Sequence, residues 1–299
     1  MYLSIFSHLI YMSLFIYVYS GLNNKLIPLF SLLRIAKKEN KIIKCYWGND
    51  AYLSKTLFKF CDLFEPVNGL EFISLQDFSK EFNNTNNIVY NRLGSDRDRN
   101  EIIYTTNNKN SVFFKIVHMI SYKNDKVIGK YVPYPRETRV NSKLIDELRE
   151  TIKDLKPKKD ILNKINIDLF KNNKILGLHI RTTDGGFVNI PKNNIFNYIS
   201  EFLKSNPLYK IYISCDNFVL EQKIIEKFPN KIYYLKNPFG INYKDKFNRN
   251  TFGTKNAICE MFSLSKCSKF IGTPGSSFTF MVWLLRNENT LNFWCKNPF

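Results

Sequence analysis

The sequence has few of the residues that metal sites and disulfide frameworks need. Its three histidines, His8, His118 and His179, lie far apart, and its six cysteines include no C-x-x-C pair. This spacing does not suit a zinc site, and a chain of 299 residues is long enough to bury a core without disulfides. We therefore expect no bound metal ion, and cysteines that are small buried hydrophobic residues in a reducing compartment.

Several motifs of common enzyme families are also missing. The chain has no G-x-x-x-x-G-K-[ST] phosphate loop, no G-x-G-x-x-G, no G-x-S-x-G and no H-E-x-x-H. No D-x-D pair follows a predicted strand, where it could hold a divalent cation against phosphates. These absences argue against kinases, dehydrogenases, serine hydrolases and zinc proteases. They leave transferases that hold a pyrophosphate with arginines and helix N-termini.

Glycine and proline are scarce, with 12 and 11 residues, which excludes collagen-like and low-complexity chains. Hydrophobic residues make up 44% of the sequence, so a disordered protein is excluded as well. The mean hydropathy of −0.27 excludes a polytopic membrane protein. The net charge of +18 fits either a solvated lysine surface or affinity for an anion such as a nucleotide, a lipid surface or nucleic acid.

The first 24 residues carry no charged side chain, and two interpretations of them remain open. Residues 14–19 have the pattern of a buried first strand, which is the interpretation that we favour. The alternative is a signal anchor over residues 3–19, although serines, His8 and tyrosines interrupt that run. We accordingly expect a cytoplasmic protein or one that associates peripherally with a membrane.

Strands and helices alternate along the chain, which predicts an α/β fold. A strand at 14–19, a helix from about Leu26 and a strand at 42–47 form a βαβ unit, and the polar stretch 83–110 is interpreted as a surface excursion. We expect two Rossmann-like domains facing a cleft, residues 1–168 and 169–299. The other predicted strands are 175–180, 210–214, 231–235, 269–272 and 290–294, and the other predicted helices are 144–155, about 160–169, 193–203, 219–228, 256–264 and 276–285.

Four polar clusters follow predicted strands, at residues 21–26, 179–186, 214–217 and 272–278. Open α/β sheets bind ligands at the carboxyl ends of their strands, so the clusters are expected to share one edge. In the second cluster Arg181 offers a planar fork for phosphate, with His179 and Asp184 beside it. The alternative there is an Arg–Asp ion pair at the end of a strand.

The last two clusters each have a functional and a structural interpretation. Asp216 could bind ribose hydroxyls, or it could cap the helix that begins near Val219. Ser276 and Ser277 cap the next helix, whose N-terminus is suited to a pyrophosphate but could also be a cap without a ligand. Arg249, further upstream, could supply a second cation.

Together these clusters resemble the GDP-fucose-dependent fucosyltransferases, most of all the α-1,6 group, with α-1,2 and protein O-fucosyltransferases as relations. The stretch 20–26 (SGLNNKL) resembles the family's amino-terminal G-x-G-N turn, and 179–184 (HIRTTD) resembles its H-x-R-R-T-D. The run from Arg249 through 256–265 to 272–278 (GTPGSSF) resembles its third region. The resemblance spans nearly the whole chain in order.

The resemblance implies a GT-B-like architecture and inverting, metal-independent transfer of fucose from GDP-fucose to a glycan or glycoprotein hydroxyl, with no other cofactor. Arg181 and His179 would contact the donor, and Asn24 would lie beside the reacting sugar. Glu260 would read the guanine edge, and Asp216 belongs to the second motif. The phosphates and fucose would be lined by Ser276, Ser277 and Phe278.

Two departures from the family pattern keep alternatives open. Thr182 stands where the family has a second arginine, and no glutamate lies between Asp184 and Pro191 to act as the general base. Asp184 is then the nearest carboxylate, as base or as a structural residue, and the departing GDP could instead help to take the proton. The alternatives for the whole chain are another nucleotide sugar, a catalytically dead relative, or a polyanion binder, although no nucleic-acid-binding motif supports the last.

Overall fold

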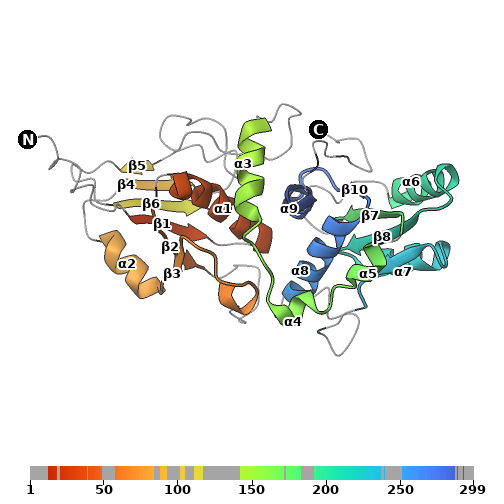
Figure 1. The fold of residues 1–299 in the computed structure, drawn as a ribbon, viewed down its shortest axis with the longest axis horizontal. Coiled ribbons are helices and arrows are strands. Elements are labelled where there is room, and N and C mark those ends of the chain that lie inside the picture. The colour runs from red at the N-terminus through yellow and green to blue at the C-terminus, as the bar shows by residue number, and fades with distance from the viewer. Residues whose placement is uncertain are drawn as a thin grey trace, which may run out of the picture.

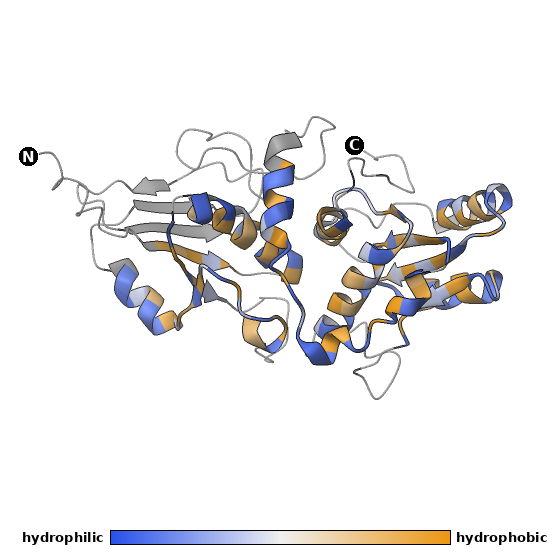
Figure 2. Ribbon diagram, viewed as in Figure 1, coloured by the Kyte–Doolittle hydropathy of each residue, from blue (hydrophilic) through white to orange (hydrophobic). Residues whose placement is uncertain are grey.

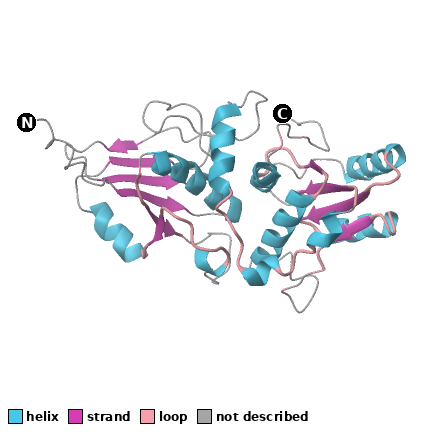
Figure 3. Ribbon diagram, in the orientation of Figure 1, coloured by secondary structure: helices cyan, strands magenta, loops and turns pink. Residues whose placement is uncertain are grey.

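We describe the protein from a computed structural model of the chain. Strands gather into two sheets, one from each half of the sequence, with helices between them (Figure 1; Figure 3). The structure describes residues 13–18, 21–38, 40–48, 58–83, 88–92, 102–104, 111–116, 142–171, 173–182, 192–236, 239, 251–286, 288 and 292.

The first sheet has the strand order β3-β2-β1-β6-β4-β5. At its centre β1 (Ser13–Val18) pairs in parallel with β2 (Ile43–Trp47) and with β6 (Ser111–Ile116). The other members are β3 (Leu70–Phe72), β4 (Ile88–Arg92) and β5 (Ile102–Tyr104), and only the β4–β5 pair is antiparallel among the described pairs. Helix α2 (Leu75–Asn83) and a 3-10 turn (Phe60–Asp62) belong to the same half.

The predicted opening of the chain is confirmed. After β1 comes α1 (Leu22–Lys38), which tolerates Pro28, and then β2, so the chain begins as a parallel βαβ unit. Ile16 and Val18 of β1 are fully buried, as a central strand requires. No helix in the described part of the chain is long and apolar enough to cross a membrane.

The prediction that 83–110 is only a surface excursion is wrong, because β4 and β5 lie within it. Each strand is short, Ile88–Arg92 or Ile102–Tyr104, and polar residues surround it. The average composition of the segment is therefore polar, although the strands themselves contain β-branched and aromatic residues. β4 joins the sheet through a parallel pairing with β6. The sheet is therefore wider than the sequence indicated.

The second sheet has the order β10-β7-β8-β9 and is parallel throughout its described pairs. Its strands and helices match the predicted ones, although the predicted strand at 290–294 lies outside the described residues except for Asn292, whose carbonyl accepts a hydrogen bond from Gly272 N at 3.0 Å. The strands are β7 (Ile175–Ile180), β8 (Lys210–Cys215), β9 (Ile232–Tyr234) and β10 (Lys269–Ile271), and the helices are α6 (Lys192–Ser205), α7 (Phe218–Lys227), α8 (Thr251–Lys266) and α9 (Ser277–Arg286).

Between the two sheets run α3 (Ser142–Ile152), α4 (Lys159–Leu162) and α5 (Ile167–Lys171). The single helix predicted for 160–169 is wrong. The side chain of Asn166 accepts a hydrogen bond from Leu169 N at 3.2 Å, so it starts a new helix and divides the segment. The predicted domain boundary after residue 168 falls inside α5 and stays a prediction.

Helix α9 packs against both α1 and α3, although it is the last helix of the second half. One hydrophobic cluster accordingly runs from β1 and α1 to α8 and α9. Figure 2 shows this apolar content as orange along α9 and the inner strands, with hydrophilic residues along α3 and α6. Contact between the halves thus fixes the helix whose N-terminus lies beside β7.

Candidate functional site

His179 is the last but one residue of β7, and its imidazole is buried, with 4% of the residue exposed. Its Nδ1 lies 2.7 Å from Oγ1 of Thr279 in α9, and its ring stacks on Phe278 with centroids 4.6 Å apart. Burial, and then the nearby charge of Arg181, lower the His179 pKa to about 3. The imidazole is therefore neutral at physiological pH and is a hydrogen-bonding group rather than a cation.

Thr273 connects the end of β7 to the turn before α9. Its hydroxyl donates to the carbonyl of His179 at 2.9 Å and accepts from the amide of Arg181 at 3.0 Å. Its own amide donates to Oγ1 of Thr279 at 3.0 Å. These bonds fix the backbone of His179 and Arg181 relative to the first turn of α9.

Asp216 holds the chain from the other side of β7, where β8 ends. Its Oδ1 accepts from the amide of Thr182 at 2.8 Å and from the hydroxyl of Thr182 at 3.3 Å. Of the two interpretations of this cluster, the capping role belongs to Asn217 and not to Asp216, because the side chain of Asn217 accepts from Leu220 N at 3.0 Å. The backbone at Arg181 is thus held on one side by the bond from its own amide to Thr273, and on the other side by the two bonds from Thr182 to Asp216.

The turn before α9 is shaped by two glycines. Gly275 adopts a positive φ of 70°, and a Cβ at Gly272 would collide with the side chain of Thr279. The hydroxyl of Ser276 lies 3.5 Å from Thr279 N, in the position of an N-cap, and Ser277 begins the helix. The positive end of the α9 dipole is therefore presented beside the carboxyl end of β7.

Glu260 is buried in α8, close to the end of β8. Its Oε2 accepts a hydrogen bond from Ser214 Oγ at 2.8 Å, and both residues are less than 10% exposed. A buried carboxylate with a fixed orientation is suited to accept two hydrogen bonds from a planar ligand edge.

The structure thus joins five of the predicted residues, namely His179, Arg181, Asp216, Ser276 and Phe278, through contacts around the end of β7. Asn24 lies in the first turn of α1, and Ser277 and Glu260 lie in α9 and α8. Asp184 and Arg249 lie outside the described residues.

Sequence reasoning did not assign a role to Thr273, Thr279 or Ser214, which hold the predicted residues in place. The sequence does contain one indication of these contacts, the turn from Gly272 to Gly275. A glycine in such a turn often allows another side chain to pack closely against the backbone. The partner of Gly272, Thr279, could not be identified without the fold. Among the described residues, no three His, Cys, Asp or Glu side chains lie close enough together to hold a metal ion.

No protein-family model and no curated protein sequence matches the chain. Solved structures do match it over nearly its whole length. The fucosyltransferase NodZ from Bradyrhizobium is 17% identical, with a TM-score of 0.56 over 91% of this chain and 93% of the other. A variant of Arabidopsis thaliana FUT1 in complex with GDP is 12% identical, with a TM-score of 0.53 over 94% of this chain and 69% of that one.

POFUT1 in complex with GDP is 10% identical to this chain, with a TM-score of 0.55, and the match covers 95% of this chain and 98% of the other. Identities this low show a common fold rather than a common substrate. The match agrees with the resemblance that the motifs indicated, and the fold of this chain is that of the fucosyltransferases.

Proposed function

We propose that the protein transfers L-fucose from GDP-fucose to a hydroxyl group of a glycan or glycoprotein, with inversion at the anomeric carbon and without a metal ion. The observation that carries the proposal is the placement of Arg181, whose backbone is bound to Thr273 at the turn that opens α9. This bond holds the Arg181 backbone at the turn before α9, and a guanidinium and a helix N-terminus are each suited to stabilise a diphosphate.

The donor side uses the groups at the ends of β7 and β8. The guanidinium of Arg181 and the amides at the start of α9 bind the pyrophosphate, and Ser276, Ser277 and Phe278 line the phosphates and fucose. The Glu260 carboxylate accepts from the guanine edge. Neutral His179 gives the donor one uncharged hydrogen bond, because its pKa of about 3 keeps the ring unprotonated.

In the reaction, the acceptor oxygen attacks the anomeric carbon from the side opposite to GDP. The bond from that carbon to the β-phosphate oxygen breaks, and its electron pair leaves with GDP. Arg181 and the α9 dipole stabilise the negative charge that grows on the leaving group. The hydroxyl proton passes to Asp184 or to the departing phosphate.

The acceptor side is assigned to the first half of the chain, with Asn24 in the first turn of α1 beside the transferred sugar. In this proposal residues 1–168 and 169–299 form two domains that face each other across a cleft. The packing of α9 on α1 and α3 supports a fixed arrangement of the two halves.

The proposal is tested by incubating the protein with GDP-fucose and a panel of glycan and glycopeptide acceptors in EDTA, and measuring released GDP. We expect turnover that is lost in Arg181→Ala, with GDP binding weakened by about 10- to 150-fold, as for a hydrogen bond to a charged group. Arg181→Lys is the matched control, since it keeps the charge but not the fork. Circular dichroism checks that both variants fold.

Two results would contradict the proposal. One is the absence of both turnover and GDP binding in the wild-type protein. The other is a larger thermal stabilisation by UDP-sugars or GDP-mannose than by GDP-fucose at equal concentration, since a ligand stabilises the fold according to its affinity.

A further inference from the structure

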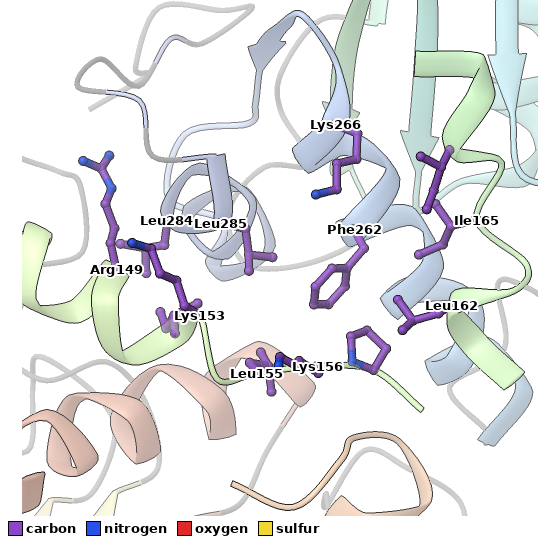
Figure 4. A pocket seen from close by; sticks show the side chains of 13 residues that line it. Arg149, Lys153, Leu155, Lys156, Leu162, Ile165, Phe262, Lys266, Leu284 and Leu285 are labelled. Atoms are coloured by element: carbon purple, nitrogen blue, oxygen red, sulfur yellow. The ribbon is translucent and has the colours of Figure 1, made fainter. Parts of the chain in front are cut away.

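A cavity of about 320 Å³ lies beside the segment that joins the two sheets (Figure 4). Its walls come from the end of α3, from residues 153–157, from α4 and α5, and from α8 and α9. It lies at the C-terminal end of α9, which is ten residues or about 15 Å long, whereas the candidate site lies at the N-terminal end. The cavity is therefore separate from the groups that would hold GDP.

The walls of this cavity are largely apolar. Figure 4 shows the ring of Phe262 between Leu285 and Leu162, with Lys266 above it and Lys156 below. Leu162, with 38% of its surface exposed, and Ile167, with 48%, lie at the same place. These apolar walls offer few of the polar partners that sugars and nucleotides need, and they are suited to a hydrocarbon chain.

Four basic residues line the cavity, and none of its described lining residues is acidic. Two of the four have partners: the Arg149 guanidinium lies 4.6 Å from the Trp283 ring and donates to the carbonyl of Glu288, and Lys153 pairs with Glu150 at 2.5 Å. Lys156 and Lys266 have no ion pair among the described residues. Both lysines are exposed, so their ammonium groups are available to an anion.

We propose that this cavity binds a free linear alkyl carboxylate, with the chain against Phe262 and the leucines and the carboxylate paired with either Lys156 or Lys266, the two lysines that flank the Phe262 ring. The unpaired cations complement a carboxylate, and the apolar walls complement the chain. The volume is at the lower end of the range for ligand pockets, about 300–1,000 Å³, so one chain fits better than a two-chain lipid. This inference does not depend on fucosyl transfer.

The test is titration calorimetry of the full-length protein with alkyl carboxylates of increasing length, each below its micelle concentration. Affinity should rise about fourfold for each methylene until the cavity is filled. Alcohols of the same length should bind more weakly. The double variant Lys156→Ala/Lys266→Ala should lower the carboxylate affinity by about three- to tenfold and leave the alcohol affinity unchanged.

Lys204→Ala, at the exposed end of α6, is the matched control and should bind as the wild-type protein does. Both cavity lysines are exposed, so their removal leaves the core intact, which circular dichroism checks. Equal affinity for carboxylate and alcohol, no dependence on chain length, or an unchanged double variant would each overturn the proposal. Binding to anionic vesicles alone would also overturn it, because the net charge of +18 explains attraction to any such surface.

Discussion

Thr182 gives both its amide and its hydroxyl to a single oxygen of Asp216, at 2.8 and 3.3 Å. Thr182 stands directly after Arg181, and Asp216 directly after β8, so the pair ties the end of the central strand β7 to its neighbour. Thr273 makes the corresponding tie on the β10 side. The backbone that carries Arg181 is therefore fixed from both sides before any ligand binds.

This geometry predicts that Asp216 acts on the nucleotide through Thr182. Asp216→Ala leaves the Thr182 amide without its acceptor, which costs about 1–3 kcal/mol and should weaken GDP binding by about 5- to 150-fold if the strand end shifts. Asp216→Asn keeps an oxygen acceptor and should bind GDP more nearly as the wild-type protein does. Titration calorimetry with GDP measures both variants.

A double-mutant cycle separates positioning from direct contact. Thr182→Val removes the hydroxyl and keeps the side-chain shape, and we expect its effect on GDP affinity to be strongly non-additive with that of Asp216→Ala. If the two effects simply add, Asp216 does not act through the Thr182 hydroxyl, and that part of the positioning role is ruled out.

Glu260 is predicted to select the base. Glu260→Gln keeps an oxygen that can accept from Ser214 but removes the charge, so it should lower the affinity for GDP by about tenfold or more and leave the affinity for ADP unchanged. A competition experiment with GDP and ADP measures the ratio of the two affinities. Ser214→Ala is the control for misplacement of the carboxylate, and an equal loss for GDP and ADP would show that Glu260 only supports the fold.

The second sheet could be predicted almost completely from the sequence, because its strands are short apolar runs separated by helices of 10–16 residues. In the first half, the opening βαβ unit and the helix at 144–155, observed as α3, could be predicted, whereas the outer strands could not. β4 joins the sheet by pairing with β6, about 24 residues further along the chain, and β5 joins by pairing with β4, and such contacts leave no local pattern.

In the candidate site, too, some features could be predicted from the sequence and others could not. Arg181 and Ser276 could be placed from strand ends and caps, because backbone geometry dictates them. The partners of Asp216 and Glu260 could not, since Thr182 and Ser214 are common residues whose roles come from the strand order β7-β8. Thr182 stands where the fucosyltransferase motif has a second arginine, and only the fold shows that its amide and hydroxyl bind Asp216.

Buried His179 predicts a specific dependence of stability on pH. Its pKa is about 3 in the folded protein and near 6.5 in the unfolded chain, so between these values the unfolded chain binds one more proton. The free energy of unfolding should therefore fall as the pH falls below 6.5, by at most about 1.4 kcal/mol per pH unit from this group. Above pH 6.5 the group contributes no slope.

Urea unfolding of the wild-type protein and of His179→Asn at pH 7, 6 and 5 measures this effect. Asparagine cannot titrate, and its side chain can still reach the Thr279 hydroxyl. The difference in slope between the two proteins belongs to His179 alone. Parallel slopes would mean that His179 has the same pKa in the folded protein as in the unfolded chain, and that burial does not keep it neutral.

The central position of β1 gives the last prediction, which decides between a strand and an anchor at the start of the chain. Ile16 is fully buried in β1, between β2 and β6, whereas Ile42, just before β2, is 54% exposed. Ile16→Ala should lower the free energy of unfolding by about 2–5 kcal/mol, the usual cost of truncating a large aliphatic side chain in a core. Ile42→Ala removes the same atoms and should change it by less than about 0.5 kcal/mol. Equal urea midpoints for the two variants would mean that residues 13–18 do not form part of the folded core.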